Sequence, residues 1–140
     1  MKFLDRETDT LPDKPSELLE LALHDFKICM KSKDYKYSTK SWHIPNGEIC
    51  EICFGGAIMA QTLFLPKNQK HSLKTVPYKT GLKLAAVDNF ATYEPIRGLT
   101  EDLGIKVPKE FIPPEPIYTT NGYSIKYLRN LIKEFKRCGI

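Results

Sequence analysis

The residue types best suited to chemistry lie in residues 42–65, which contain a C-x-x-C pair formed by Cys50 and Cys53. His43 precedes the pair in the pattern H-x6-C-x2-C. Imidazole nitrogens and thiolates are the usual ligands of zinc, and a structural zinc ion takes four of them in tetrahedral geometry. The other histidines and cysteines are distant in the sequence: His24, Cys29, His71 and Cys138. The spacing therefore allows a zinc site at His43, Cys50 and Cys53, with a fourth ligand that the sequence does not define.

Two other interpretations of the C-x-x-C pair remain open. A thiol at the start of a helix can have a lowered pKa and act as a nucleophile, but redox sites of this kind need a βαβ context that is not indicated here. The zinc-deaminase pattern H-x-E followed by P-C-x-x-C is absent, because Pro45 stands two residues after His43 and Ile49 precedes Cys50. Free cysteines are among the most buried residue types, so the sequence favours Cys50 and Cys53 as small core residues.

The motifs of common enzyme classes are missing from the sequence. It contains no Gly-rich phosphate loop, no G-x-S-x-G elbow, no H-E-x-x-H motif and no EF-hand loop. A dyad of His43 with either cysteine would lack the third group that orients the base. The sequence therefore predicts a protein that is not an enzyme, with a thiol-dependent or zinc-dependent activity as the alternative.

A second candidate surface combines lysines with aromatic residues in residues 33–42. Proteins bind single-stranded nucleic acid and nucleotides by stacking bases on aromatic rings and pairing phosphates with lysines. The net charge is +4, and further bases gather in residues 67–79 and 126–137. This ligand-binding surface would comprise Lys33, Tyr35, Lys36, Tyr37, Lys40, Trp42, Lys67, Lys70, Lys74, Arg129, Lys133 and Arg137. The sequence favours a simpler arrangement, in which the tyrosine rings lie on the core with their hydroxyls in water.

The spacing of apolar residues predicts a mostly α fold, a small helical bundle around a buried central helix. We expect helices over residues 15–32, 80–93 and 123–138, and a central helix that begins after a turn at residues 45–47 and has its most apolar part at 53–65. The helix over 53–65 is apolar on nearly all sides, which is typical of a buried central helix. A short β-hairpin at residues 35–44 is compatible with the pattern.

The central helix has two local features. Glu48 and Glu51 fall at its predicted first turn, where carboxylates suit the helix dipole. Gly55 and Gly56 follow inside it, and each glycine costs about 1 kcal/mol of helix propensity. Close approach of a neighbouring helix to Gly56 and Ala60 is the interpretation that we favour, and a ligand lying against bare backbone is the alternative.

The 140 residues are enough for one domain with a core of its own. We expect a flexible N-terminal arm over residues 1–12 and a single domain over 13–140, which includes a Pro-rich arm at 107–118. That arm is expected to wrap its own domain or to reach a second subunit, which would give a homo-oligomer. The chain has no apolar run of membrane-spanning length, and its polar N-terminus does not resemble a signal peptide. We therefore expect no membrane contact and a cytoplasmic location.

Two short motifs resemble the core of small uncharacterised proteins of tailed bacteriophages. These are WHxP at residues 42–45 followed by CxxCxxGAxMA at 50–60, and LAAVDNF at 84–90, which is similar to an LxALDxxR helix in that group. Gly55 stands where alanine is usual, and Ala91 stands near the place of the arginine. The group has no assigned activity, so the resemblance implies bacteriophage origin rather than a reaction.

These observations predict a small, non-enzymatic, phage-type accessory protein that acts in the host cytoplasm. It would bind, and thereby inhibit, a host protein such as a defence factor. Binding of nucleotides or nucleic acid through the basic and aromatic surface is one alternative. A zinc or thiol site at His43, Cys50 and Cys53 is the other, and zinc is the only cofactor that the sequence suggests.

Overall fold

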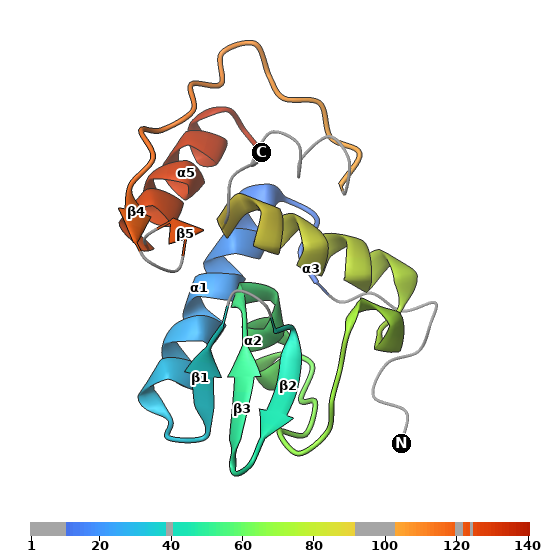
Figure 1. Cartoon of the computed structure of the whole chain (residues 1–140). Coiled ribbons are helices and arrows are strands. Elements are labelled where there is room, and N and C mark those ends of the chain that lie inside the picture. Colours follow the sequence, from blue (N-terminus) through green and yellow to red (C-terminus); the bar gives the residue numbers. More distant parts are fainter. Residues whose placement is uncertain (1–10, 39–40, 92–102, 120–121, 124) are drawn as a thin grey trace.

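The computed structural model describes residues 11–38, 41–91, 103–119, 122–123 and 125–140 (Figure 1). In chain order its elements are α1 (Pro15–Lys31), β1 (Tyr35–Tyr37), β2 (His43–Asn46), β3 (Ile49–Ile52), α2 (Phe54–Gln61), the 3-10 helix η1 (Leu73–Thr75), α3 (Tyr78–Ala91), β4 (Tyr118–Thr119), β5 (Gly122–Tyr123) and α5 (Ile125–Arg137). Residues 1–10 of the predicted N-terminal arm lie outside the described residues.

The architecture is mixed, with helices and a small sheet. Within the described residues, four α-helices accompany a three-stranded sheet. The predicted high helical content is therefore confirmed. The sheet is larger than the predicted hairpin, because a third strand joins it, and the fold is a small α/β domain rather than helices alone.

The two amphipathic helices at the ends of the chain begin and end close to the predicted residues. α1 buries Leu18, Leu19 and Phe26 on one face, with Pro15 in its first turn, where the missing N–H costs nothing. α5 buries its face through Leu131 and Phe135. Each helix therefore packs one apolar stripe against the core and exposes a polar stripe, as the helical period requires.

The prediction of one long central helix is wrong at its N-terminal end, where the chain forms β3 and then the shorter helix α2. In β3, Cys50 and Ile52 are buried while Ile49 is exposed and Glu51 is half-buried. This alternation is the two-residue period of a strand with one buried face. Short apolar segments satisfy helical and strand spacing alike, which explains the error.

β3 is the middle strand of the sheet, in the order β1-β3-β2. β2 and β3 form an antiparallel hairpin whose turn contains Gly47 at φ +68°, a conformation that glycine adopts without strain. β1 runs parallel to β3, with Tyr35 opposite Cys50. The hairpin predicted at residues 35–44 is therefore wrong in position.

The position predicted for Glu51, in the first turn of the central helix, is also wrong. Glu51 is a strand residue, and its side chain accepts a hydrogen bond from Asn46 Nδ2 (2.9 Å).

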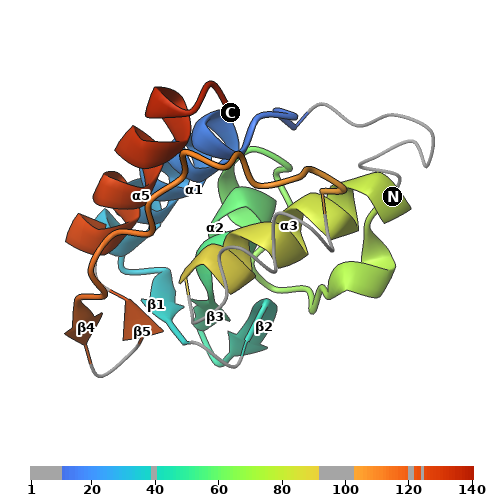
Figure 2. The same ribbon diagram turned by 90° about the horizontal axis from the view of Figure 1, so that it is seen from above.

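α2 lies behind the sheet, with α1 along one side and α3 crossing it, as the two perpendicular views agree (Figures 1 and 2). Its N-cap is Cys53, whose Sγ accepts a hydrogen bond from the backbone N–H of Gly56 at 3.4 Å. All residues from Phe54 to Ala60 are buried. The central position predicted for this helix is thus confirmed, although α2 itself is only 8 residues long.

The two glycines of α2 are needed for close packing, but the main neighbour is not another helix. A Cβ atom on Gly56 would lie 1.7 Å from the carbonyl oxygen of Trp42, and one on Gly55 would lie 2.4 Å from the Trp42 ring. The same Gly55 position would be 3.2 Å from the Leu84 carbonyl oxygen on α3. The predicted close approach is therefore present, and the segment just before β2 makes most of it.

The Pro-rich arm lies along α5 of its own chain. The backbone N–H of Ile112 donates to Glu134 Oε2 (2.6 Å), and the Arg137 side chain donates to both carboxylate oxygens of Glu134 at 2.6 and 2.7 Å. The ring of Phe111 stacks on that of Phe135, with centroids 5.5 Å apart. Among the described helices, none has the length and apolar character that crossing a membrane requires.

Candidate functional site

The exposed faces of α1 and α5 form a groove of about 530 Å³, which we call the α1–α5 groove. The two helices lie side by side in both ribbon views (Figures 1 and 2). The lining residues are Glu20, Leu23, His24, Lys27, Ile28 and Lys31 from α1 and Arg129, Ile132 and Lys133 from α5.

The helical period explains why these residues share one groove. On α1, Glu20, His24, Lys27 and Lys31 follow one another at intervals of three or four residues, so their side chains form one continuous stripe. On α5, Arg129 and Lys133 have the same i, i+4 relation. The buried stripes of α1 and α5 pack into the core, and that packing brings the two exposed stripes next to each other.

The floor of the groove is apolar. Leu23 and Ile132 are 6% and 7% exposed, and Ile28 at the edge is 41% exposed. A partner that covers these side chains would remove apolar area from water at roughly 25 cal/mol per Å². The floor can therefore contribute affinity only to a ligand that presents apolar groups of its own.

The rim of the groove is cationic. Lys27, Lys31, Arg129 and Lys133 are all exposed, and within the described part of the chain none of them forms an ion pair. The one carboxylate of the lining, Glu20, is paired with Lys136. The groove therefore offers four uncompensated cations around an apolar floor.

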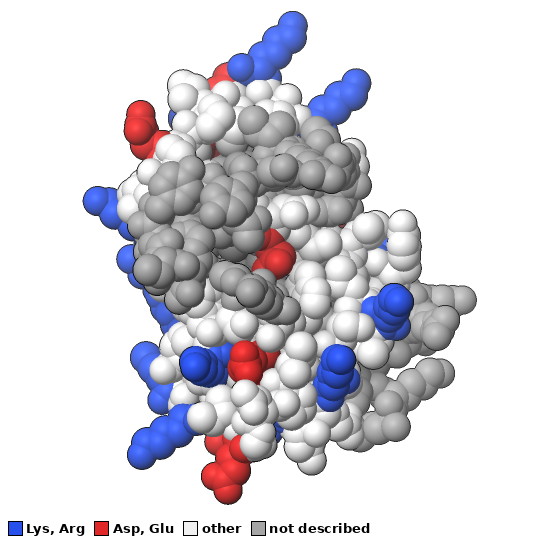
Figure 3. Space-filling view, viewed as in Figure 1, with Lys and Arg blue, Asp and Glu red and all other residues white. Residues whose placement is uncertain are grey.

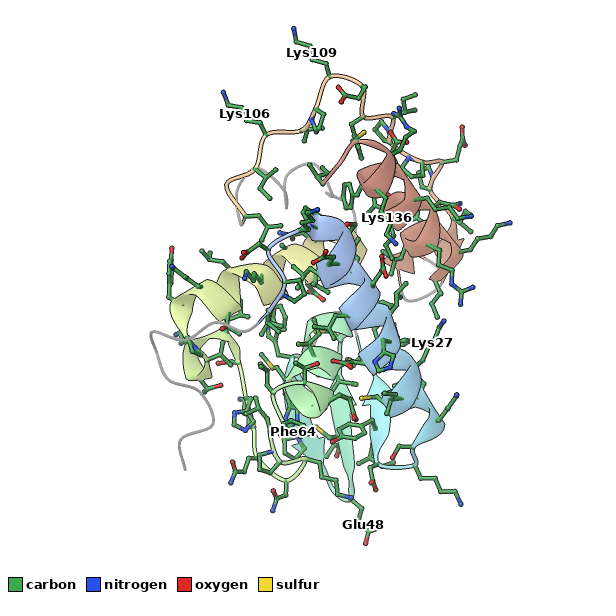
Figure 4. The ribbon with its side chains drawn as sticks, turned by 180° about the vertical axis from the view of Figure 1, so that it is seen from behind. Lys27, Glu48, Phe64, Lys106, Lys109 and Lys136 are labelled. Carbon is green, nitrogen blue, oxygen red and sulfur yellow. The ribbon has the colours of Figure 1, made fainter. Side chains whose placement is uncertain are left out.

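The pictures agree with this distribution of charge. Lys and Arg side chains project along the left edge of the molecule in Figure 3, where Figure 1 places α5, α1 and β1. From behind, Figure 4 shows Lys27 projecting from α1 on the side where α5 lies. Lys109 on the Pro-rich arm and Lys106 just before it, by contrast, project at the far end of the molecule (Figure 4).

The structure does not bring the predicted basic and aromatic residues together on one surface. Of that set, only Arg129 and Lys133 line the α1–α5 groove. Arg137 is engaged with Glu134, and Lys67 is paired with Asp34 at 2.8 Å. Lys36 is exposed in β1, Lys33 and Lys70 are exposed in loops, and Lys74 is exposed in η1. Lys40 lies outside the described residues.

The aromatic members of the predicted surface are packed inward. The ring of Tyr37 makes edge contacts with those of Phe26 and Phe54, with centroids 5.3 and 5.5 Å apart. Tyr35 is half-buried against the core, and the half-buried ring of Trp42 covers Gly55. These rings are not available as open platforms for stacking bases, which matches the simpler arrangement that the sequence favoured.

The α1 half of the groove was not predicted from the sequence. The helix dipole favours lysines at the C-terminal end of any helix, so the lysines near the end of α1 did not by themselves indicate a binding site. The repeated i, i+4 and i, i+3 spacing of Glu20, His24, Lys27 and Lys31 was visible. What the sequence could not provide was the packing of α1 beside α5, because α5 begins at residue 125, far along the chain.

The three proposed zinc ligands have different places in the structure. Cys50 is buried in β3, and Cys53 caps α2, while His43 in β2 faces His71 with ring centroids 5.2 Å apart. Within the described residues, no three His, Cys, Asp or Glu side chains are placed to share one metal ion.

Burial raises the pKa of both central thiols. It raises the pKa of Cys50 to about 11, and it raises the pKa of Cys53 still further, with the negative charge of Asp88 as a second cause. The pKa of the Asp88 carboxyl is itself raised by burial, although its hydrogen bond with Cys53 opposes the shift. Both cysteines are therefore neutral thiols at pH 7, whereas a nucleophile needs a thiolate.

No family model, no curated protein and no solved structure matches this chain.

Proposed function

We propose that this protein is a non-enzymatic binding protein whose α1–α5 groove takes an acidic amphipathic helix of a protein partner. The observation that carries the proposal is the combination of four unpaired cations with an apolar floor in one groove. A helix whose one side carries leucine-like residues flanked by Glu or Asp complements both parts. Laying an apolar helix face into a groove is a recurring mode of recognition.

Nucleic acid fits this groove less well than a helix does. A phosphate backbone would satisfy Lys27, Lys31, Arg129 and Lys133 but would leave Leu23, Ile28 and Ile132 without an apolar partner. The rings that would stack on bases are packed into the core elsewhere. Both observations support a protein ligand over nucleic acid.

The resemblance of residues 42–60 and 84–90 to small proteins of tailed bacteriophages suggests where the partner is found. A protein of that origin meets the proteins of a bacterial host. We propose that occupation of the groove by a host helix inhibits the host factor, for example a component of defence, and that this takes place in the host cytoplasm.

The test uses synthetic peptides of defined chemistry. The probe is a fluorescent helical peptide with leucines at i, i+3, i+4 and i+7 and glutamates beside them, and the reference is a scrambled peptide of equal composition. We expect the ordered peptide to bind at least about tenfold more tightly, because only it can cover the floor while it pairs with the rim. Fluorescence anisotropy measures both dissociation constants.

Matched charge reversals locate the binding. Lys27→Glu combined with Lys133→Glu reverses two rim charges and should weaken binding about tenfold or more. Lys106→Glu combined with Lys109→Glu changes net charge equally at the far end and should leave affinity unchanged. Equal binding of both peptides, equal effects of both double variants, or tighter binding of a single-stranded oligonucleotide than of the ordered peptide would each contradict the proposal.

A further inference from the structure

The Pro-rich arm contains a segment, residues 112–116 with the sequence IPPEP, whose backbone conformation is largely fixed by its residue types. Each proline ring holds φ near −65°, which is close to the value of about −75° in a polyproline II helix. A residue that precedes a proline is restricted to extended backbone, and this applies to Ile112, Pro113 and Glu115. The sequence therefore favours a polyproline II helix, and residues 111–117 contain no α-helix or β-strand.

Burial along the arm repeats every three residues, which is the period of a polyproline II helix. Phe111 is buried, and Pro114 and Ile117 are half-buried, so the residues at this spacing face the domain. The residues between them are exposed: Ile112, Pro113, Glu115 and Pro116. The arm therefore turns one side towards its own domain and presents two residue pairs, 112–113 and 115–116, to solvent.

Both ends of this segment are held by the domain. At one end the ring of Phe111 stacks on that of Phe135, and the backbone N–H of Ile112 donates to Glu134 Oε2 at 2.6 Å. At the other end Ile117 packs against the core, and β4 follows, paired with β5 (Figure 1). Because the segment is ordered before a partner arrives, little conformational entropy is lost when a partner binds it.

We propose that residues 112–116 are a docking segment for a partner protein that has an aromatic-lined groove for polyproline II helices. Grooves of this kind bind PxxP segments, and Pro113 and Pro116 form that motif here. Both prolines lie on the exposed side of the arm. Ile112, whose side chain is 68% exposed although its N–H is bonded, adds an apolar group to the first pair.

The charge of the segment narrows the choice of partner. Glu115 is exposed and forms no ion pair in the described part of the chain. An acidic side chain beside the partner's groove would repel this carboxylate, whereas a basic one would complement it. The groove of the partner is therefore flanked by lysine or arginine.

A second copy of this chain does not offer such a groove among its described residues. The exposed aromatic side chains there are Phe64 and Tyr78, which lie on separate segments, the loop after α2 and the start of α3. The rings of Tyr37 and Trp42 are packed against other residues of their own chain. These observations favour a different protein as the partner.

The experiment measures binding of the full chain to purified SH3 and WW domains by biolayer interferometry. The domains form two groups, with basic or with acidic side chains beside the aromatic groove. We expect saturable binding to at least one domain of the basic group, and weaker binding or none in the acidic group. Absence of binding to every domain, or tightest binding in the acidic group, would overturn the proposal.

Single proline variants provide the matched comparison. Pro113→Ala and Pro114→Ala each remove one ring from the same arm, but only Pro113 belongs to the exposed side. Pro113→Ala should weaken binding at least about tenfold, as expected for a central contact, whereas Pro114→Ala should change it less than about twofold. Ile112→Ser keeps all the prolines and the backbone N–H, and it should weaken binding about fivefold. Melting temperatures close to that of the parent show that the variants fold. Equal effects of Pro113→Ala and Pro114→Ala would overturn the proposal.

Sedimentation velocity of the parent chain tests a second copy as the occupant. We expect a monomer, because the described residues provide no aromatic groove for the segment. A dimer that dissociates in Pro113→Ala would show that another copy of the chain binds residues 112–116, and would overturn the assignment to a different protein.

Discussion

The centre of the molecule and the α1–α5 groove differ in a way that the residue types alone do not suggest. The centre contains the only tryptophan and a C-x-x-C pair, yet its thiols are buried and protonated, and the tryptophan ring covers Gly55. The groove is made of ordinary lysines, an arginine and aliphatic residues, but its cations are exposed and unpaired in the described chain. Residues that can do chemistry in isolation are used here for packing, and the surface best suited to a ligand is built from common residues.

This contrast predicts that substitutions in the two regions separate stability from binding. Changes at the centre should lower the free energy of unfolding and leave the affinity of the folded protein for an acidic amphipathic peptide unchanged. Changes in the groove should do the reverse, since exposed charges contribute little to folding. Two variants at the centre test this separation, and a third variant outside both regions tests what holds the Pro-rich arm. They follow in order of expected effect.

The largest effect is expected from Gly56→Ala. The added Cβ would lie 1.7 Å from the carbonyl oxygen of Trp42, and a backbone atom cannot move aside as a flexible side chain can. We expect a loss of about 3 kcal/mol in the free energy of unfolding, measured by urea denaturation. Gly81→Ala in α3 is the matched control, because its Cβ would be 3.4 Å from the nearest atom, and we expect unchanged or slightly higher stability. Equal stability of Gly56→Ala and the parent chain would break the packing account.

A smaller loss is expected from Cys53→Ala. The thiol accepts the Gly56 N–H at the start of α2, and loss of an N-cap acceptor costs about 1 kcal/mol. Cys53→Ser retains an acceptor and should cost less. Peptide affinity should not change in either variant. Loss of peptide binding in a Cys53→Ala protein that is as stable as the parent would mean that the centre has a chemical role after all.

The smallest effect is expected at Glu134, which joins the Pro-rich arm to α5. Hydrogen bonds from Arg137, and then from the Ile112 N–H, lower the pKa of Glu134 from 4.5 to about 2. Because the pKa is lower in the folded state, the ionised carboxylate of Glu134 contributes to the free energy of unfolding above pH 4.5. This contribution is lost as the pH falls from 4.5 towards 2. The melting temperature of Glu134→Gln should therefore lie below that of the parent at pH 7, and the difference should shrink on acidification.

Glu115→Gln provides the reference for that pH series, because Glu115 is exposed on the same arm and makes no ion pair in the described structure. Its melting temperature should follow that of the parent at every pH. A Glu134→Gln curve that runs parallel to the parent curve down to pH 3 would show that this carboxylate does not hold the arm.

The parts of the fold that the sequence predicted are those in which one period dominates over many residues. α1 and α5 satisfy the 3.6-residue period along their whole length, so the predicted bounds of both helices were close to the observed ones. The junction between β3 and α2 was missed because Cys50, Ile52 and Cys53 fit both a strand and a helix over so short a segment. Tertiary pairing with β1 and β2 decides between the two, and no local pattern reports it.

Only the α5 half of the candidate site could be predicted from the sequence, for the same reason. Arg129 and Lys133 were named because they form a basic stripe within one helix. Lys27 and Lys31 belong to the same groove only because α1 packs beside α5, a contact between segments that are remote in the chain. The His43–His71 pair depends likewise on the loop that returns His71 to β2, which spacing in the sequence does not reveal.

The most direct test of the binding account is to map the acidic amphipathic peptide onto the protein by ¹H–¹⁵N NMR titration. We predict that the shifted amides cluster in residues 20–31 and 129–133 and that the amides of residues 43–60 remain unchanged. Shifts confined to residues 33–42 and 67–74, or centred on Cys53, would contradict the assignment of function to the α1–α5 groove.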